Sequence, residues 1–186
     1  MVEVEQKFRG VDFAALEQRL RAAGAIEGER RAEADHYFNA PDRDFARTDE
    51  ALRIRRTGTA NYVTYKGPKR DLQTKTRTEI EVPLGDGDGA ADDFARILVQ
   101  LCYRPVAVVR KQRRTFRLER DGFQLAVTLD EVAGVGKFAE LEIDVGEEKL
   151  DAARATLLRV AQELGLADSE RRSYLELLLS KQAKSV

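Results

Sequence analysis

The chain has 186 residues, the usual size of one domain or at most two small ones, and we expect a single domain over residues 1–186. Charged residues make up 35% of the composition, but 32 basic and 33 acidic side chains leave a net charge of -1. This balance excludes a generally basic surface. It therefore argues against non-specific binding of nucleic acid or of an anionic membrane, while it still allows a locally basic cavity.

Cysteine and histidine are too rare to build a disulfide or a typical zinc site. Cys102 is the one cysteine and His36 the one histidine, so any bound metal would be held mainly by carboxylates. The sequence has no apolar run long enough to span a membrane, and it opens on a charged alternating stretch instead of a signal peptide. We therefore expect a cytoplasmic protein.

The first stretch, residues 2–8, alternates apolar and charged side chains, which is the period of a β-strand. Its charged face consists of Glu3, Glu5 and Lys7. For one strand alone, a charged face that meets water is the simplest interpretation. The later strands decide whether that interpretation holds.

Strand and helix patterns alternate through the first half of the chain. Asp12 is a suitable N-cap for an amphipathic helix that would end near Gly24. A short strand is expected over residues 34–38, and a helix capped by Asp92 or Asp93 is expected further on.

Three strands in this half repeat the charged-face design of the first stretch. Residues 51–55 and 62–66 flank a turn and predict a hairpin. Residues 76–82 predict the next strand, which we expect Pro83 to close. The second half predicts strands over 108–118, 123–130 and 138–144, a turn at Asp121 and Gly122, a helix over 148–164 and a final helix capped by Ser173.

The polar faces of these strands carry equal numbers of opposite charges. The carboxylates are Glu3, Glu5, Glu79, Glu81, Asp130, Glu140 and Glu142. The cations are Lys7, Arg53, Arg55, Lys66, Arg77, Lys111 and Arg113.

About eight strands, many of them hairpin partners, favour an α+β fold in which an eight-stranded antiparallel closed β-barrel is flanked by helices. Because the helices carry apolar stripes, they would pack on the apolar outer face of the strands and leave the charges inside. An enclosed charged interior is costly unless a ligand uses it. Clustered carboxylates bind Mg²⁺ or Mn²⁺, and clustered Arg and Lys bind phosphate. A metal-bound polyphosphate would therefore be a suitable ligand for both the carboxylates and the cations.

The motif Glu3-x-Glu5-x-Lys7 resembles the E-x-E-x-K signature of the CYTH superfamily, the triphosphate tunnel metalloenzymes. The resemblance spans essentially the whole chain, because further family elements follow in order: Leu52-Arg53-Ile54-Arg55, Lys66-Gly67-Pro68, Arg77-x-Glu79-x-Glu81, Lys111-x-Arg113, Asp130, and Gly136-x-Phe138-x-Glu140-x-Glu142. Residues 102–105, 111–113, 136–140 and 172–174 are most similar to the class IV adenylyl cyclase branch.

The resemblance implies an eight-stranded tunnel and a division of roles among the charged residues. One or two Mg²⁺ or Mn²⁺ ions would be held by Glu3, Glu5, Glu81, Asp130, Glu140 and Glu142. A triphosphate would be gripped by Lys7, Arg53, Arg55, Lys66, Arg77, Lys111 and Arg113, of which Lys7, Arg53, Lys111 and Arg113 would also be catalytic.

The activity implied first is that of a class IV adenylyl cyclase, which forms 3′,5′-cyclic AMP and pyrophosphate from ATP. A thiamine triphosphatase or an inorganic triphosphatase is the alternative, and a non-catalytic polyphosphate-binding module comes third. Related cyclases also suggest a homodimer. The residues that would recognise a base or a thiamine ring do not emerge from the sequence.

Overall fold

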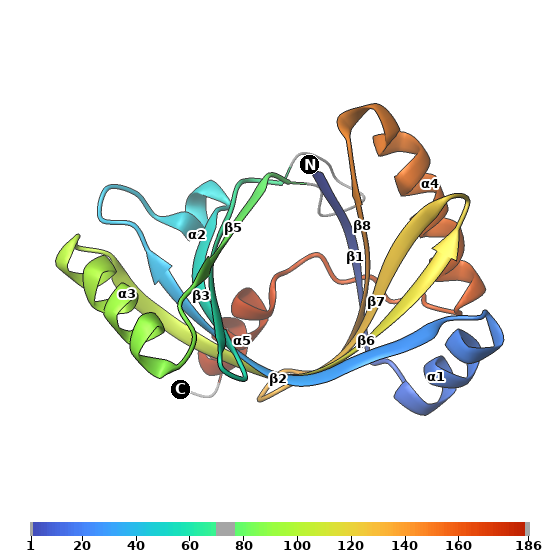
Figure 1. The fold of residues 1–186 in the computed structure, drawn as a ribbon, viewed down its shortest axis with the longest axis horizontal. Helices are drawn as coiled ribbons and strands as arrows, with labels where there is room; N and C mark the ends of the chain where they lie inside the picture. The colour runs from blue at the N-terminus through green and yellow to red at the C-terminus, as the bar shows by residue number, and fades with distance from the viewer. Residues whose placement is uncertain (1, 70–76, 185–186) are drawn as a thin grey trace.

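The computed structural model describes residues 2–69 and 77–184, so position 76 of the strand predicted over 76–82 lies outside the described residues. Eight antiparallel strands form one sheet in the order β1-β8-β7-β6-β2-β3-β4-β5. They are β1 Val2–Arg9, β2 Ile26–Asn39, β3 Ala51–Thr57, β4 Ala60–Lys66, β5 Glu79–Leu84, β6 Arg104–Arg120, β7 Phe123–Val132 and β8 Gly136–Val145. The sheet curls around an open centre, as the view along its axis shows (Figure 1).

Five α-helices and one 3-10 turn accompany the sheet in the described ranges 2–69 and 77–184. They are α1 Phe13–Ala22, α2 Phe45–Thr48, α3 Asp88–Gln100, the 3-10 turn η1 Glu147–Lys149, α4 Leu150–Glu163 and α5 Tyr174–Gln182. Of the helices in this part of the chain, none has the length and apolar character needed to cross a membrane.

The curled sheet has a seam between its two outermost strands, β1 and β5. Across this seam the described residues show one isolated bridge, which pairs Glu3 with Arg77, and no continuous ladder. The antiparallel eight-stranded sheet is therefore confirmed, whereas the continuous hydrogen bonding of a closed barrel is absent from the described seam.

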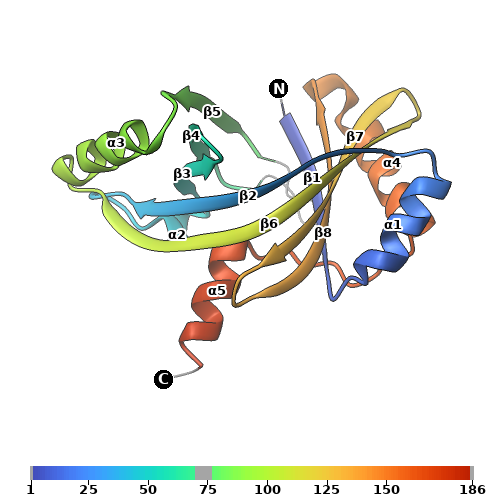
Figure 2. The same cartoon turned by 60° about the horizontal axis from the view of Figure 1, so that its bottom comes forward.

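The apolar core lies outside the tunnel. Helices α1 and α4 cover the outer face of β1, β8, β7 and β6, where Val4, Leu16, Leu141 and Leu157 belong to one fully buried cluster (Figures 1 and 2). Helix α3 covers Ile54 of β3 on the other side. Because the helices take up the apolar face of each strand, the charged face is turned inward, as the sequence predicts.

Strand β2 is much longer than the predicted 34–38 segment. Its first half is a run of charged and exposed side chains that lacks apolar alternation, and it is extended because it pairs with β6 from Ile26 onward. Tertiary pairing, not local pattern, makes this part a strand.

Two predicted boundaries around β5 are wrong. Pro83 does not close the strand but lies inside it, where an outermost strand tolerates the missing N–H. Helix α3 begins at Asp88, well before Asp92 or Asp93, because Gly87 with φ of 83° turns the chain into the helix directly. The predicted caps at Asp12 and Ser173 are confirmed, the latter as a complete capping box.

Candidate active site

A cavity of about 560 Å³ lies within the curled sheet. All but one of the predicted site residues line it: Glu3, Glu5, Lys7, Arg53, Arg55, Lys66, Arg77, Glu81, Lys111, Arg113, Glu140 and Glu142. The exception is Asp130. These side chains come from β1, β3, β4, β5, β6 and β8, and Arg77 lies just before β5.

Strand register explains how β1 and β8 place their charges. Glu5 is directly opposite Glu142 and Lys7 is directly opposite Glu140, so each pair projects from the same face of the sheet. Glu3 lies two residues before Glu5 and shares that face. The wall formed by these two strands is consequently rich in carboxylates.

Two arginines of β3 are held by a single carboxylate that is not in the predicted site. Asp35 of β2 accepts from Nε and Nη2 of Arg55 at 2.7 and 2.8 Å and from Nη1 of Arg53 at 3.2 Å. Burial opposes ionisation of Asp35, but Arg53 and Arg55 outweigh it and hold its pKa well below the ordinary value. Asp35 thus fixes both guanidinium groups before any ligand arrives.

Two cations of β6 are held in the same manner. Nε and Nη2 of Arg113 donate to the two oxygens of Asp130 at 2.7 and 2.5 Å, and Nη2 also donates to Glu140 at 2.6 Å. The ammonium of Lys111 lies 3.1 Å from Glu33 Oε2 and 3.8 Å from Asp130 Oδ2. Asp130 is fully buried, so it stands behind the cavity wall and supports the cations that line it.

Tyr174, at the first turn of α5, contacts both lysines. The Lys7 ammonium lies 4.1 Å from the centre of its ring and the Lys111 ammonium 5.4 Å. Its hydroxyl donates to Asp130 Oδ2 at 2.9 Å. Lys7 is 1% exposed and also donates to the backbone oxygen of Arg172. One aromatic side chain therefore contacts two ammonium groups and the carboxylate that supports Lys111 and Arg113.

Glu33, Asp35 and Tyr174 contact the cations of the cavity and are absent from the predicted site. Glu33 directly precedes the predicted strand 34–38, and Asp35 lies in it. The two residues are two positions apart and so share one face of a strand, which is the signal that could have identified them. Tyr174 belongs to the segment 172–174 that resembles the class IV branch, but the apolar pattern of the final helix does not indicate that this helix returns to the cavity.

The remaining charges gather near the seam. The Lys66 ammonium lies 3.4 Å from Glu3 Oε2 and pairs closely with Glu79. Glu81, which is exposed, accepts from Oγ1 of Thr64 at 2.8 Å. Burial, above all, raises the pKa of Glu3 well above its ordinary value in spite of the nearby Lys66.

The carboxylate wall fits a hard divalent cation in its chemistry. Burial, and then the charge of Glu5, raise the pKa of Glu142 to about 7, which means that negative charge on this wall is poorly compensated by the protein itself. Among the described residues, however, no three His, Cys, Asp or Glu side chains are close enough to hold a metal ion. Mg²⁺ usually takes one or two protein carboxylates and completes its shell with water and substrate phosphates.

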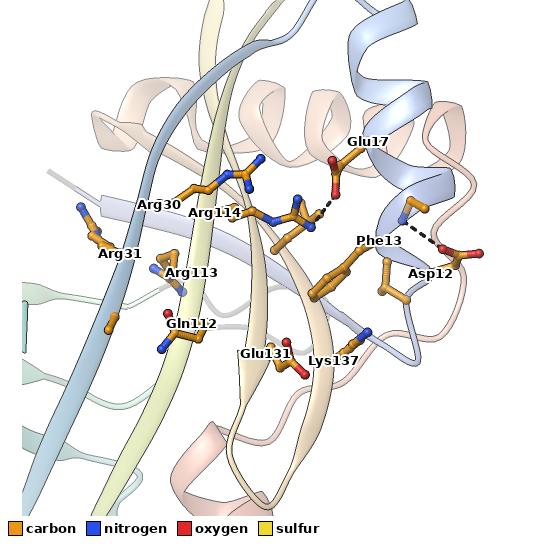
Figure 3. Close-up of a pocket in the computed structure, with 14 residues that line it drawn as sticks. Asp12, Phe13, Glu17, Arg30, Arg31, Gln112, Arg113, Arg114, Glu131 and Lys137 are labelled. Atoms are coloured by element: carbon orange, nitrogen blue, oxygen red, sulfur yellow. Dashed lines mark hydrogen bonds and ion pairs between the residues drawn. The ribbon is translucent and has the colours of Figure 1, made fainter.

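A second cavity, of about 790 Å³, lies between α1 and strands β2, β6 and β7 (Figure 3). Two of its cations form ion pairs: Arg114 with Glu17, and Arg30 with Glu27 at 2.7 Å. It has no counterpart to the carboxylate wall of the tunnel, so the tunnel is the stronger candidate for an active site.

The CYTH domain family model matches residues 1–174. A protein of Methanocaldococcus jannaschii that is provisionally named an adenylate cyclase is 35% identical over 180 residues, which cover 95% of this chain and 98% of that protein. Adenylate cyclase CyaB of Aeromonas hydrophila is 33% identical over 178 residues, which cover 92% of this chain and 86% of that protein.

Solved structures agree with these relatives. The PH1819 protein of Pyrococcus horikoshii has 38% sequence identity and a TM-score of 0.84, with 96% of this chain and 99% of that chain covered. A Hippeastrum protein, provisionally named an adenylyl cyclase and described as having a dominant triphosphatase activity, shares the fold at 15% identity and a TM-score of 0.67, with 96% of this chain and 95% of that chain covered. The chain belongs to the CYTH family, whose members are divalent-metal-dependent enzymes that act on triphosphates.

Proposed function

We propose that this protein is a class IV adenylyl cyclase that converts ATP to 3′,5′-cyclic AMP and pyrophosphate. The observation that carries the proposal is one cavity lined by a wall of carboxylates and by ten basic side chains, among them all seven predicted cations. Relatives that cover nearly the whole chain and bear the adenylate cyclase name support the cyclase branch.

The cations supply a rigid grip for the triphosphate. Asp35 holds Arg53 and Arg55, and Asp130 holds Arg113, so these guanidinium groups need little reorganisation when phosphate oxygens enter. Lys66 and Arg77 add positive charge from the seam side. The bound triphosphate would replace part of the internal ion pairing with contacts to its own oxygens.

A bound Mg²⁺ or Mn²⁺ would neutralise phosphate charge and lower the pKa of the attacking ribose 3′-hydroxyl. The carboxylates that line the cavity, Glu3, Glu5, Glu81, Glu140 and Glu142, are the candidate ligands, of which one or two would contact each ion.

During attack of the 3′-hydroxyl on the α-phosphorus, negative charge builds up on the α-phosphate and on the leaving pyrophosphate. Lys7, Lys111 and Arg113 would offset this charge. We assign Asp130 to positioning, because both of its oxygens already accept from Arg113 and Tyr174 and its side chain does not line the cavity.

Hydrolysis of the terminal phosphate is the second candidate function, with thiamine triphosphate or inorganic triphosphate as substrate. The Hippeastrum protein, which has this fold and a dominant triphosphatase activity, supports this second candidate. The same phosphate-binding cations would serve equally well when water is the nucleophile. A non-catalytic polyphosphate-binding module is the third candidate, and it predicts tight binding without turnover under any metal.

Product analysis separates the three. The purified protein would be incubated with Mg²⁺ or Mn²⁺ and with ATP, thiamine triphosphate or tripolyphosphate, and the products identified by chromatography. Cyclic AMP and pyrophosphate in equal amounts are expected from ATP. Orthophosphate without cyclic AMP would contradict the cyclase and favour the hydrolase, and binding without any product would favour the module.

A further inference from the structure

The tunnel cavity continues along β6 beyond the predicted site residues, toward the turn between β6 and β7 and away from α5 (Figure 2). In this direction it is lined by a group that we call the turn-side lining: Gly28, Glu29, Arg31, Thr115, Arg117, Ala126 and Thr128. None of these residues belongs to the predicted site. The polar members Arg117 and Thr128 distinguish this part of the cavity, because the protein itself does not use their side-chain polar atoms.

Arg117 extends the row of inward cations on β6. Lys111, Arg113 and Arg117 occupy alternate positions of one strand and line the same cavity. Four residues separate the last two, which is about 13 Å along an extended strand. Lys111 and Arg113 are held by buried carboxylates. The guanidinium of Arg117 is exposed, and within residues 2–69 and 77–184 it has no ion pair or side-chain hydrogen bond.

Cross-strand register places Arg117 on the same row as the carboxylate wall. Arg117 is paired with Ala126 of β7, and Ala126 is paired with Glu142 of β8. Directly paired residues project from the same face of a sheet, so this row faces the tunnel. Two strand spacings, about 10 Å, separate the backbones of Arg117 and Glu142. Because the intervening side chain is only a methyl group, an extended arginine has room to reach toward the carboxylates.

Thr128 adds an unused hydroxyl to the next row. It is paired with Thr115 of β6 on one side and with Glu140 of β8 on the other. Its side chain is 4% exposed, and its buried Oγ1 finds no hydrogen-bond partner in the part of the chain that the structure describes. A buried hydroxyl without a partner costs free energy, and this one lines the cavity, where an oxygen of a ligand can accept from it.

We propose that Arg117 and Thr128 bind the outermost phosphate of the substrate, on the side of the central cations that faces away from α5. This inference rests on the proposed function, since it places a triphosphate in the tunnel. The guanidinium of Arg117 would donate to the non-bridging oxygens of that phosphate, and Oγ1 of Thr128 would donate beside it. In a cyclase the outermost phosphate departs with the pyrophosphate, so Arg117 would also offset the charge that develops on the leaving group.

The test measures binding of ATP and of tripolyphosphate by calorimetry in EDTA, which stops metal-dependent turnover. Arg117→Gln removes the charge and Arg117→Lys keeps it, while Thr128→Val removes the hydroxyl and Thr128→Ser keeps it. Arg110→Gln is the matched control, because Arg110 is an exposed arginine of the same strand that lies outside the cavity lining. Thermal melting without ligand checks that each variant folds.

Arg117→Gln is expected to weaken the binding of both ligands about fivefold, because the contact is charge-assisted but partly screened by water. Arg117→Lys should lose less than Arg117→Gln, and Arg110→Gln should stay within twofold of the unmodified protein. Thr128→Val should weaken binding about threefold and Thr128→Ser less than twofold. In turnover of ATP with Mg²⁺, Arg117→Gln should lower kcat as well as raise KM, because a contact to the leaving group strengthens in the transition state.

Equal binding by Arg117→Gln and Arg110→Gln would overturn the role of Arg117 and leave the central phosphate site standing. Unchanged binding by Thr128→Val would overturn the role of its hydroxyl in the same way. Failure of the unmodified protein to bind either ligand would overturn the proposed function and this inference together.

Discussion

Glu142 is a residue whose negative charge the folded protein compensates poorly. It lies opposite Glu5 in the β1–β8 pair, and burial together with that neighbour raises its pKa from 4.5 to about 7. The folded state therefore holds this proton more tightly than the unfolded chain does. Below about pH 4.5 the Glu142 carboxyl is protonated in both the folded and the unfolded state, so it does not change the free energy of unfolding. Between about pH 4.5 and 7 the unfolded chain releases this proton first, and the free energy of unfolding falls.

The size of the effect follows from the two pKa values. The difference between 4.5 and about 7 corresponds to a loss of about 3 kcal/mol once Glu142 is fully ionised in the metal-free protein. Glu142→Gln keeps the size of the side chain and removes its charge. In EDTA at pH 8.5 we therefore expect the variant to be more stable than the parent by up to about 3 kcal/mol.

Urea denaturation in EDTA at pH 5 and at pH 8.5 measures the free energy of unfolding of both proteins. The gain should appear at pH 8.5 and shrink to below about 1 kcal/mol at pH 5, where the parent carboxyl is mostly protonated. Glu131→Gln on the neighbouring strand is the control, because Glu131 is exposed and lies outside the cavity lining. Lower stability of Glu142→Gln at pH 8.5, or the same gain at both pH values, would refute the reasoning.

Four further outcomes test the rest of the site. Asp130→Asn breaks the buried pair with Arg113 and is expected to lower the free energy of unfolding by about 3–5 kcal/mol, measured by urea denaturation. Asp93→Asn, at an exposed ion pair, is the control and should change it little. Equal stability of the two variants would contradict the supporting role of Asp130. Asp35→Asn loosens Arg53 and Arg55, so the KM for ATP should rise about tenfold, and an unchanged KM would show that the pair is already fixed by other contacts. Tyr174→Phe removes the hydrogen bond to Asp130 and should lower the free energy of unfolding by about 1 kcal/mol. Tyr174→Leu also removes the ring from two ammonium groups and should weaken tripolyphosphate binding about fivefold more than Tyr174→Phe does. Identical binding by both variants would exclude a role for the ring. Removal of metal with EDTA should abolish turnover of ATP and retain measurable binding of tripolyphosphate, and retained turnover would contradict the metal requirement.

The sequence predicts the inward charges because strand periodicity depends only on neighbouring residues. Glu3, Glu5 and Lys7 alternate with apolar residues, and the structure places all three on the cavity. The apolar stripes of the helices add the reason for turning the charged face inward, since they must pack on the apolar face of the strands. These local rules predict most of the charged residues that line the cavity.

What the sequence does not predict depends on contacts between distant segments. The early part of β2 has no strand pattern of its own and is extended only by pairing with β6. Asp130 was expected at the metal, but its depth behind the wall depends on Arg113 and Tyr174, which approach from two other elements. The same holds for Asp35, whose significance appears only once β3 lies beside it.

The seam between β1 and β5 has a consequence for how ligand binding would affect the whole protein. Arg53, Arg55 and Lys66 belong to the half of the sheet that ends at β5, whereas Glu3, Glu5 and Glu142 belong to the half that ends at β1. Strands β2 and β6 are the continuous ribbon between the halves (Figure 1). A metal-bound triphosphate would thus link the two halves, because its phosphates would contact the cations of one half and its metal the carboxylates of the other. Separating β1 from β5 would require breaking one of these two groups of contacts. Saturating ligand should therefore slow hydrogen exchange most strongly at the amides of β1 and β5, the strands with the fewest partners of their own.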